Sequence, residues 1–369
     1  MARYRVVELY AGIARTWEAF RSWRRADLSL LVDHDEYARL TYVINHVSAP
    51  YCVLDLKRTS PSRIEALAGG KIDILLGCPP CQGFSDTGTR NPDDIRNAHI
   101  AVFSRFISEL KPRVFVMENV PLLATSNRFA SLTRKLESLG YLWDAAILNG
   151  ALYGSCQTRQ RLMMVGARRS IGQPRLPLPT HGGSRKYFSY SRQEFLTLRE
   201  GDADILGEAP ATGQASFAVP YLRTPPGRRP IPNIWETIGD LQGCSKEEAY
   251  KLSHVPWKHT GAMTRRMSGV KEGKRWRGGR NHYSQSYGRL HRQGLSRTLT
   301  CSFPNPGSGR FWHPTEDRSI TLREAARIQG IEDEFYFVPP FSWAASLVGN
   351  ALDIGIARAA EAAVRNLLD

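Results

Sequence analysis

Short, nearly unbroken apolar runs recur through the first ~170 residues, separated by stretches with a helical pattern. Runs of this kind are typical of strands that are buried on both faces of a sheet. The stretch 98–110 carries its apolar residues along one side, which predicts a helix that ends before Pro112. This alternation predicts an α/β fold with a doubly wound, mostly parallel sheet. We expect its strands at Arg5–Tyr10, Leu28–Val32, Ile72–Leu76, Val114–Met117 and Arg161–Val165.

The pattern is lost near residue 170 and returns near residue 314. Between 171 and 313, proline, glycine, serine, arginine and tryptophan are frequent and no clear periodicity remains. Thr321–Gln329 is then predicted to be a helix, with Thr321 as its N-cap and Glu324 as the capping-box partner. An alanine-rich helix follows from Val348. We therefore predict one α/β domain, residues 1–170 completed by 314–369, with a loop-rich domain, 171–313, inserted into it.

Positive charge is concentrated in one part of the chain. The net charge is +15, and residues 251–300 hold twelve Lys and Arg against a single acid, Glu272. A concentrated basic segment indicates a polyanionic partner, most often a nucleic acid. A solvated basic loop would have the same composition, so charge alone leaves both interpretations open.

Composition excludes several classes of protein. Six cysteines in 369 residues are too few for a disulfide scaffold. No apolar run reaches the ~18 residues that a membrane span requires. Met1–Arg5 leads directly into an apolar run without the pattern of a signal peptide. We therefore expect a cytoplasmic protein with no membrane partner.

A candidate nucleophile, Cys81, follows a predicted buried strand and a Pro79–Pro80 corner. Ligands bind at the carboxyl edge of open α/β sheets, and a thiol there can attack a substrate if its pKa is lowered or a base is near. Cys78 and Cys81 could instead form a redox pair or half of a zinc site. The sequence has no second Cys-x-x-Cys and no suitably spaced His pair, so we predict no metal. Cys78 is better interpreted as a buried structural residue.

Charged residues occur at two further strand ends. Glu118 ends an apolar strand, where a buried carboxylate is costly unless it is paired or used. Arg159 and Arg161 precede another strand and share one face if that segment is extended. Taken singly, each of these residues is equally well explained as a structural ion-pair partner.

Taken together and in order, these segments resemble the DNA (cytosine-5)-methyltransferase family in its bacterial, S-adenosylmethionine-dependent form. The resemblance runs from residue 5 to about residue 360, and only the stretch from ~170 to ~285 lacks a family-wide pattern. An ordered set of motifs is far more specific than any single one. The matching blocks are Glu8–Gly12, Pro80–Ser85, Glu118–Val120, Gln157–Arg161, Thr321–Arg327 and Gly349–Asn350.

The resemblance implies a Rossmann-like catalytic domain and a target-recognition domain at 171–313. It implies transfer of a methyl group from S-adenosylmethionine to C5 of a flipped-out cytosine in a specific duplex DNA sequence. Cys81 would add to C6 of the base, Glu118 would bind N3 and the amino group, and Arg159 and Arg161 would hold O2. The cofactor would be bound by Tyr10, Ala11, Gly12, Ile13, Asp33, His34, Asp55, Leu56, Pro80, Asn350 and Ala351.

The expected partner is double-stranded DNA, bound by a monomer, so that the cytoplasmic protein would associate with the nucleoid. Components of a restriction or phage-defence system are possible further partners. Aromatic residues such as Trp276 fit packing inside the inserted domain better than contact with a DNA groove. The expected DNA contacts are Gln82, Ser85 and Arg96 after the nucleophile, and Lys271, Lys274, Arg275, Arg277, Arg280 and Arg289 in the basic segment.

One motif departs from the family. The usual Gly-x-Gly-Gly turn reads Gly12-Ile13-Ala14-Arg15. Either Arg15 points away or pairs with an acid and leaves cofactor affinity normal, or cofactor binding is weakened and needs DNA or a partner to complete it. His99 is a second departure, because the family usually has leucine there.

Two other functions stay open. The chain could be an RNA cytosine-5 methyltransferase, or a partner-dependent or catalytically silent DNA-binding subunit. A large recognition module favours duplex DNA over RNA. The joint presence of Cys81, Glu118, Arg159 and Arg161 argues against a silent subunit.

Overall fold

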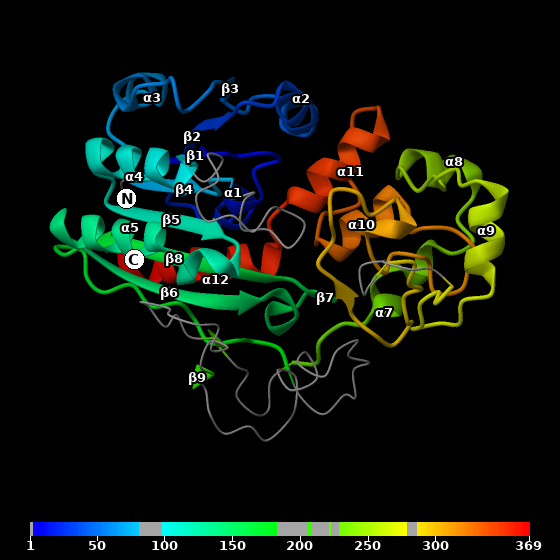
Figure 1. The fold of residues 1–369 in the computed structure, drawn as a ribbon. Helices are drawn as coiled ribbons and strands as arrows, with labels where there is room; N and C mark the ends of the chain where they lie inside the picture. The colour runs from blue at the N-terminus through cyan, green and yellow to red at the C-terminus, as the bar shows by residue number, and fades with distance from the viewer. Residues whose placement is uncertain (1–2, 81–97, 183–205, 208–220, 223–228, 279–285) are drawn as a thin grey trace.

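The computed structural model describes residues 3–80, 98–182, 206–207, 221–222, 229–278 and 286–369 (Figure 1). Its main sheet has the strand order β3-β2-β1-β4-β5-β8-β6-β10-β9 in the described part of the chain. The strands from β3 to β5 are parallel, whereas β8 runs antiparallel to both β5 and β6. This arrangement confirms the predicted α/β fold with a mostly parallel sheet. The strands are β1 Tyr4–Leu9, β2 Ala26–Asp33, β3 Tyr51–Val53, β4 Ile74–Gly77, β5 Val114–Asn119, β6 Tyr141–Asn149, β8 Gln160–Arg168, β9 Leu206–Gly207 and β10 Tyr221–Leu222.

Helices cover both faces of this sheet (Figure 1). One hydrophobic cluster joins the sheet to α1 (Arg15–Phe20) and α12 (Ile354–Leu368). A second cluster joins the opposite face to α3 (Pro61–Leu67), α4 (Ala98–Leu110) and α5 (Asn127–Ser138). The sheet is therefore doubly wound, and its central strands are buried on both sides because their residues alternate between the two clusters.

A second lobe lies beside the carboxyl end of the sheet, at the right of Figure 1. A third hydrophobic cluster holds this lobe together and includes residues from both 234–311 and 320–351. Packing thus joins α10 and α11 to elements of the predicted inserted domain, whose functional boundaries stay a prediction. The lobe contains α7 Ile234–Ile238, η5 Gly239–Leu241, α8 Lys246–Lys251, α9 Gly261–Ser268, η6 Pro306–Ser308, α10 Leu322–Ile328 and α11 Phe341–Asn350.

Local signals explain where several elements begin and end. Thr321 caps α10 and Glu324 closes the predicted capping box. The single helix predicted from Val348 is wrong, because α11 ends at Asn350 and α12 begins after Asp353. The Asp353 side chain accepts hydrogen bonds from the amides of Gly355 and Ile356 and so starts a new helix.

Several shorter elements complete the description. Helix α2 (Glu36–Asn45) follows β2 and is capped by Asp35. A separate parallel pair joins β7 (Gln157–Thr158) to β11 (Ser296–Arg297) and ties the second lobe to the start of β8. The 3-10 helices η3 (Pro121–Thr125) and η4 (Gly150–Tyr153) follow β5 and β6. Among the described residues, no helix is both long and apolar enough to cross a membrane.

Candidate active site

The candidate catalytic residues meet at one edge of the sheet because β8 is reversed. Residues at the carboxyl ends of the parallel strands share this edge, and the first residues of an antiparallel neighbour lie there too. Glu118 on β5 is paired with Met163 on β8. The Gln157–Arg161 motif, which begins just before β8, is thereby brought beside the Glu118–Val120 motif.

Glu118 and Arg161 form an ion pair at this edge. Arg161 Nε lies 2.8 Å from Glu118 Oε1, and both side chains are mostly buried, at 15% and 13% exposure. Arg161 Nη1 also donates to the carbonyl of Gln160. The pair presents a carboxylate and a guanidinium side by side, which suits recognition of a base edge that carries both donors and acceptors.

Arg159 is held behind this pair by backbone carbonyls. Its Nη1 donates to Leu299 O and its Nη2 to Gly349 O, each at 3.2 Å, and the residue is 2% exposed. Burial lowers the pKa of the Arg159 guanidinium, and the charge of Arg161 lowers it further. Its Nε is buried without a partner among the described residues. This concentrated positive charge favours a ligand that is, or becomes, negatively charged.

The predicted nucleophile Cys81 lies outside the described residues, but the corner that leads to it is described. Asn119 Nδ2 donates to Pro79 O at 2.9 Å and fixes the Pro79–Pro80 corner against the end of β5. Four predicted DNA contacts also lie outside the described residues: Gln82, Ser85, Arg96 and Arg280.

The neighbouring Cys78 is unsuited to nucleophilic attack. Burial raises the pKa of the Cys78 thiol well above its usual value, and the carboxylates of Glu118 and Glu8 raise it further. Its Sγ lies 3.5 Å from Thr16 Oγ1. A thiol that stays protonated is a poor nucleophile. Cys78 is half-buried rather than fully buried, and it packs against the cluster that joins the sheet to α1 and α12, which fits a structural role.

The turn after β1 leaves room for a ligand. Gly12 adopts a φ of 52°, its amide donates to Asp33 Oδ2, and its carbonyl accepts from the Tyr51 hydroxyl. A side-chain carbon at Gly12 would meet no atom within 4 Å. The turn therefore has open space above it and a carboxylate beside it.

Asp33 is held as a carboxylate at this turn. Burial alone would raise the pKa of Asp33, but hydrogen bonds from the His34 side chain and from the amides of Gly12 and Asp35 outweigh it and lower the pKa. The bond to Asp33 in turn raises the pKa of His34, whose side chain is 81% exposed. An ionised acceptor next to an open glycine turn fits the hydroxyls of a nucleoside ligand.

Three other predicted cofactor residues differ in their exposure and in their hydrogen-bond partners. The Tyr10 ring packs edge-on against His99, whose Nδ1 lies 3.2 Å from the Tyr10 hydroxyl. Asp55 is half-exposed and accepts from the amide of Lys57. Asn350 is exposed, and its Oδ1 accepts from Cys301 Sγ at 2.9 Å.

Four predicted cofactor residues carry side chains turned into the protein. Ile13 packs in the cluster of the second lobe and Leu56 in the cluster on the α4 face. Ala11 and Ala351 are also buried, at 6% and 7% exposure. These positions can contribute backbone groups to a ligand site. Pro80 is half-buried at the corner described above.

The unusual Gly12–Arg15 turn keeps the shape of a tight turn without its second glycine. Ala14 takes up a left-handed conformation with φ 53° and is fully buried. The Arg15 side chain points away from the turn, with Nη1 3.7 Å from Glu332 and Nη2 bonded to Gly330 O. The predicted pairing of Arg15 with an acid is therefore present, and the effect of this turn on cofactor affinity stays a prediction.

Four basic residues of the predicted DNA surface are exposed. Lys271, Lys274, Arg275 and Arg277 follow α9. Trp276, in the same segment, is half-buried and packs with Met267, Val270 and Trp312, as predicted for an aromatic of this domain.

Arg289 requires a correction. It is only 5% exposed, and its guanidinium donates to the carbonyls of Met267, Val270, His313 and Glu316 and to Asp317 Oδ1. Every donor position is occupied. The structure assigns Arg289 to holding this loop together and not to a DNA-facing surface.

Two further residues position the site, and one of them, Gln329, was not predicted. Gln329 Nε2 donates to the carbonyls of Val348 and Ala351, and its Oε1 accepts from Gln157. Gln157 in turn accepts from the amide of Leu299. This buried pair of amides fixes the end of α11, where Asn350 lies. Gln157 belongs to the Gln157–Arg161 motif, whereas Gln329 carries no sequence signal except its place at the end of α10.

Comparisons with known proteins agree with this geometry. Residues 4–365 match the model of the C-5 cytosine-specific DNA methylase family. The Type II methylase M.HgiDII of Herpetosiphon aurantiacus is 28% identical over 80% of this chain and 77% of its own length. The Type II methyltransferase M.DdeI of Desulfomicrobium norvegicum is 26% identical over 96% of this chain and 86% of its own.

A solved structure supports the fold. A prophage-encoded protein of E. coli, described as a DNA modification methyltransferase, superposes with a TM-score of 0.64 at 23% identity and covers 99% of both chains. At this identity the likeness bears on the fold alone. The family match, however, spans nearly the whole chain and includes every motif at the edge of the sheet. The chain therefore belongs to the C-5 cytosine-specific DNA methylase family, whose members transfer a methyl group from S-adenosylmethionine to C5 of cytosine in DNA.

Proposed function

We propose that this DNA cytosine-5 methyltransferase modifies one short duplex sequence and that Cys81 is its nucleophile. The observation that carries the assignment is the cluster of Glu118, Arg161 and Arg159 at the edge where Asn119 fixes the corner leading to Cys81. A cytosine turned out of the duplex would meet donors, an acceptor and a thiol at one place.

The reaction follows from the properties of these side chains. The Cys81 thiolate forms a bond to C6, and the electrons of the C5–C6 double bond move to C5. S-adenosylmethionine, when bound, supplies an electrophilic methyl group on a positively charged sulfur. The electron pair at C5 would form a bond to that methyl carbon, and the sulfur would leave as a neutral thioether with the electrons of the broken bond. Loss of the C5 proton to a base then restores the C5–C6 double bond and expels the thiolate. Glu118 accepts from the amino group of the base and shares a proton with N3, while Arg161 and Arg159 stabilise the negative charge that develops at O2.

We infer that the cofactor lies over the Gly12 turn. The Asp33 carboxylate is placed for the ribose hydroxyls, and Asp55 for the adenine amino group. The exposed His34 ring would lie against the adenine, and Tyr10 would contribute to the turn that holds the cofactor. Asn350 would line the same site, with its amide orientation fixed by the contact to Cys301.

The biological setting is inferred from relatives. M.HgiDII and M.DdeI carry Type II names, which supports a role beside a restriction nuclease or in a similar defence system. We propose that the enzyme acts as a monomer on DNA and that the exposed basic residues after α9 contact phosphates. The protein would then be found with the DNA of the cell.

The test is a methylation map. The wild type, Cys81→Ser and Cys78→Ser are each expressed in a host without cytosine methylation, and 5-methylcytosine is located across the genome and in total RNA. We expect the wild type and Cys78→Ser to mark the same short motif, and Cys81→Ser to mark none. Cys78 serves as the matched control because it is a cysteine of the same segment whose raised pKa makes its thiol a poor nucleophile.

Other outcomes would change the assignment. Methylation retained in Cys81→Ser would exclude Cys81 as nucleophile. Methylation confined to RNA would replace the DNA substrate. An unmarked genome with the wild type would mean an inactive or partner-dependent protein, and cofactor binding would then be measured directly.

A further inference from the structure

Arg15 connects the cofactor turn to a distant part of the chain. It follows the left-handed Ala14 directly and its side chain is 3% exposed. The guanidinium reaches the connection between α10 and α11, where it bonds to Gly330 O and pairs with Glu332. Its Nε is buried without a partner in the described part of the chain. A buried guanidinium with few alternative acceptors cannot move independently of the loop that holds it.

That loop is clamped by two more arginines. Arg323 Nη1 donates to Glu332 O and its Nη2 to Phe335 O, both at 2.7 Å. Arg327 binds Asp333 through two parallel hydrogen bonds of 2.9 and 2.6 Å. Bidentate pairs fix orientation as well as distance. The loop therefore moves with α10 as one unit.

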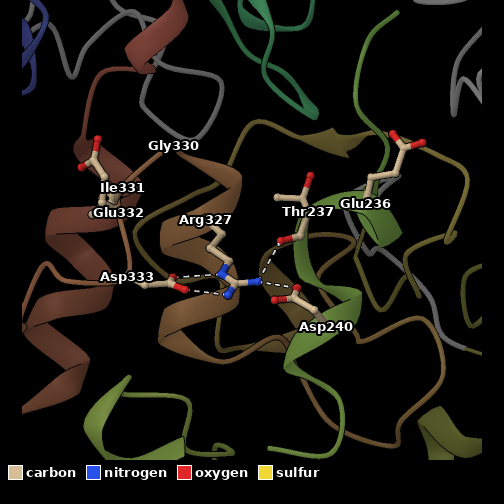
Figure 2. Close-up of a pocket in the computed structure, with 8 residues that line it drawn as sticks. All are labelled: Glu236, Thr237, Asp240, Arg327, Gly330, Ile331, Glu332 and Asp333. Carbon is tan, nitrogen blue, oxygen red and sulfur yellow. Dashed lines mark hydrogen bonds and ion pairs between the residues drawn. The ribbon is translucent and has the colours of Figure 1, made fainter. Parts of the chain in front are cut away.

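Arg327 also contacts residues of the predicted target-recognition domain. Arg327 Nη1 bonds to Asp240 Oδ1 at 2.5 Å and to Thr237 O at 3.3 Å, as Figure 2 shows. Asp240 belongs to η5 and Thr237 to α7. The residues that make these contacts line an open pocket of about 470 Å³ between α7 and the Gly330–Asp333 loop. A continuous set of polar contacts thus runs from the cofactor turn to α7 and η5.

We propose that Arg15 is a positioning residue that makes cofactor binding and DNA binding cooperative. A ligand that binds to the Gly12–Ala14 turn and orders it also fixes the backbone from which Arg15 extends. Arg15 then holds the Gly330–Asp333 loop, and Arg327 passes this restraint to α7 and η5. DNA that orders α7 and η5 stabilises the same arrangement from the other end. The proposal rests on the proposed function, which places the cofactor at this turn and DNA against the second lobe.

Coupling of this kind is reciprocal. If DNA raises cofactor affinity by a given factor, the cofactor must raise DNA affinity by the same factor. Coupling between sites is typically at least about fivefold. We therefore expect DNA to tighten cofactor binding about fivefold or more in the wild type, and this ratio to fall towards one when the contacts are broken.

The experiment is calorimetry without turnover. S-adenosylhomocysteine, the demethylated cofactor, is titrated into the protein alone and into protein saturated with sheared DNA from a host without cytosine methylation. Arg15→Met keeps the bulk of the side chain and removes its charge. Asp240→Asn removes the negative charge that pairs with Arg327 at the far end of the contacts, and because this side chain is 68% exposed we expect the variant to fold. Arg21→Met, on an exposed arginine next to α1, is the control.

For the wild type and Arg21→Met, the dissociation constant of S-adenosylhomocysteine without DNA should be about fivefold or more above the constant with DNA. Arg15→Met and Asp240→Asn should both lose this difference, and Asp240→Asn should bind S-adenosylhomocysteine without DNA within about twofold of the wild type. A wild-type ratio of one, or an unchanged ratio in Asp240→Asn, would overturn the coupling. Failure of the wild type to bind S-adenosylhomocysteine at all would instead count against the proposed function, so the two failures are distinguishable.

Discussion

Individual charged residues at the edge of the sheet are buried to an unusual degree, and each has a specific partner. Glu8 on β1 is 1% exposed, and its Oε2 accepts from the amide of Trp17 at 2.8 Å. Burial raises the pKa of Glu8 from 4.5 to about 8, against the lowering effect of that hydrogen bond. Glu8 is therefore protonated at neutral pH and acts as an uncharged bridge between β1 and α1.

Glu8→Gln should reduce the loss of stability at high pH. In the wild type, the unfolded chain ionises Glu8 above pH 4.5 while the native protein keeps its proton up to about pH 8. Stability therefore falls as pH rises through this window. At about 1.4 kcal/mol for each tenfold change in proton affinity, the loss is on the order of 3–5 kcal/mol. Gln keeps the hydrogen-bond acceptor but has no proton to lose.

The measurement is urea unfolding of wild type and Glu8→Gln from pH 5 to pH 9. The exposed Glu137→Gln on α5 is the control, because it should follow the wild-type curve. Parallel curves for wild type and Glu8→Gln would show that Glu8 is ionised in the native protein.

The sequence predicted where the site lies in the fold better than it predicted the burial and the direction of individual side chains. The resemblance predicted that Glu118 and Arg161 act on the same base, and they form an ion pair. Composition could not distinguish the buried Arg289 from the exposed arginines around it, because burial depends on contacts with residues such as His313 that are distant in sequence. The direction of the Arg15 side chain depends on Gly330 in the same way.

At the level of elements, strands with continuous apolar runs were predictable and mixed strands were not. β3 has only three residues at the edge of the sheet. β6 is half-buried along Leu142–Asp144 and carries an aspartate, so its pattern resembles neither a buried strand nor a clean alternation. Asp144 is tolerated there because its Oδ2 accepts from the amide of Leu176.

The contact between α11 and the 299–301 segment depends on a glycine. A side-chain carbon at Gly349 would lie 2.5 Å from both Cys301 N and Thr300 C, which are backbone atoms. Gly349→Ala should therefore force the helix away from this segment, disturb the Arg159 anchor and cost about 1–3 kcal/mol of stability.

Gly269→Ala is the matched control for that prediction, because a side-chain carbon there would meet nothing within 4 Å. Urea unfolding and the initial rate of DNA methylation test both variants. Gly349→Ala should lose stability and activity together, while Gly269→Ala should stay near the wild type. Wild-type behaviour of Gly349→Ala would mean that this contact is looser than the structure shows.

At the scale of the molecule, the candidate cofactor turn and the predicted DNA-binding surface lie in different lobes. The sheet and its helices carry the candidate cofactor turn, whereas the exposed basic residues after α9 belong to the second lobe (Figure 1). Periodicity predicted the first lobe well because its core is built from regular strands and helices. The second lobe is stabilised by side chains that hydrogen-bond to irregular backbone, as those of Arg289 and Arg323 do. Such contacts leave no periodic pattern in the sequence.

The basic surface should make DNA binding depend on salt. Log affinity falls with log salt concentration by about 0.9 for each phosphate neutralised. Replacing Lys274, Arg275 and Arg277 with Gln should flatten this slope by about two to three. Fluorescence anisotropy with a labelled duplex between low and moderate salt measures the slope.

Three exposed basic residues of the other lobe provide the comparison. Replacing Arg63 on α3 and Arg134 and Lys135 on α5 with Gln removes the same charge from helices away from α9. This variant should keep the wild-type slope. Equal slopes in all three proteins would mean that the segment after α9 is only a solvated face.

The anchoring of Arg159 also has a consequence during protein synthesis. Its two acceptors, Leu299 and Gly349, follow it by 140 and 190 residues. At ~5–20 residues per second, a ribosome needs roughly 10–40 s to cover the longer distance. A growing chain thus displays Glu118 and Arg161 well before Arg159 has its anchors. The anchors of Arg159 form only after residue 349 has been made, and a chain interrupted before that point carries Glu118 and Arg161 beside an unanchored Arg159.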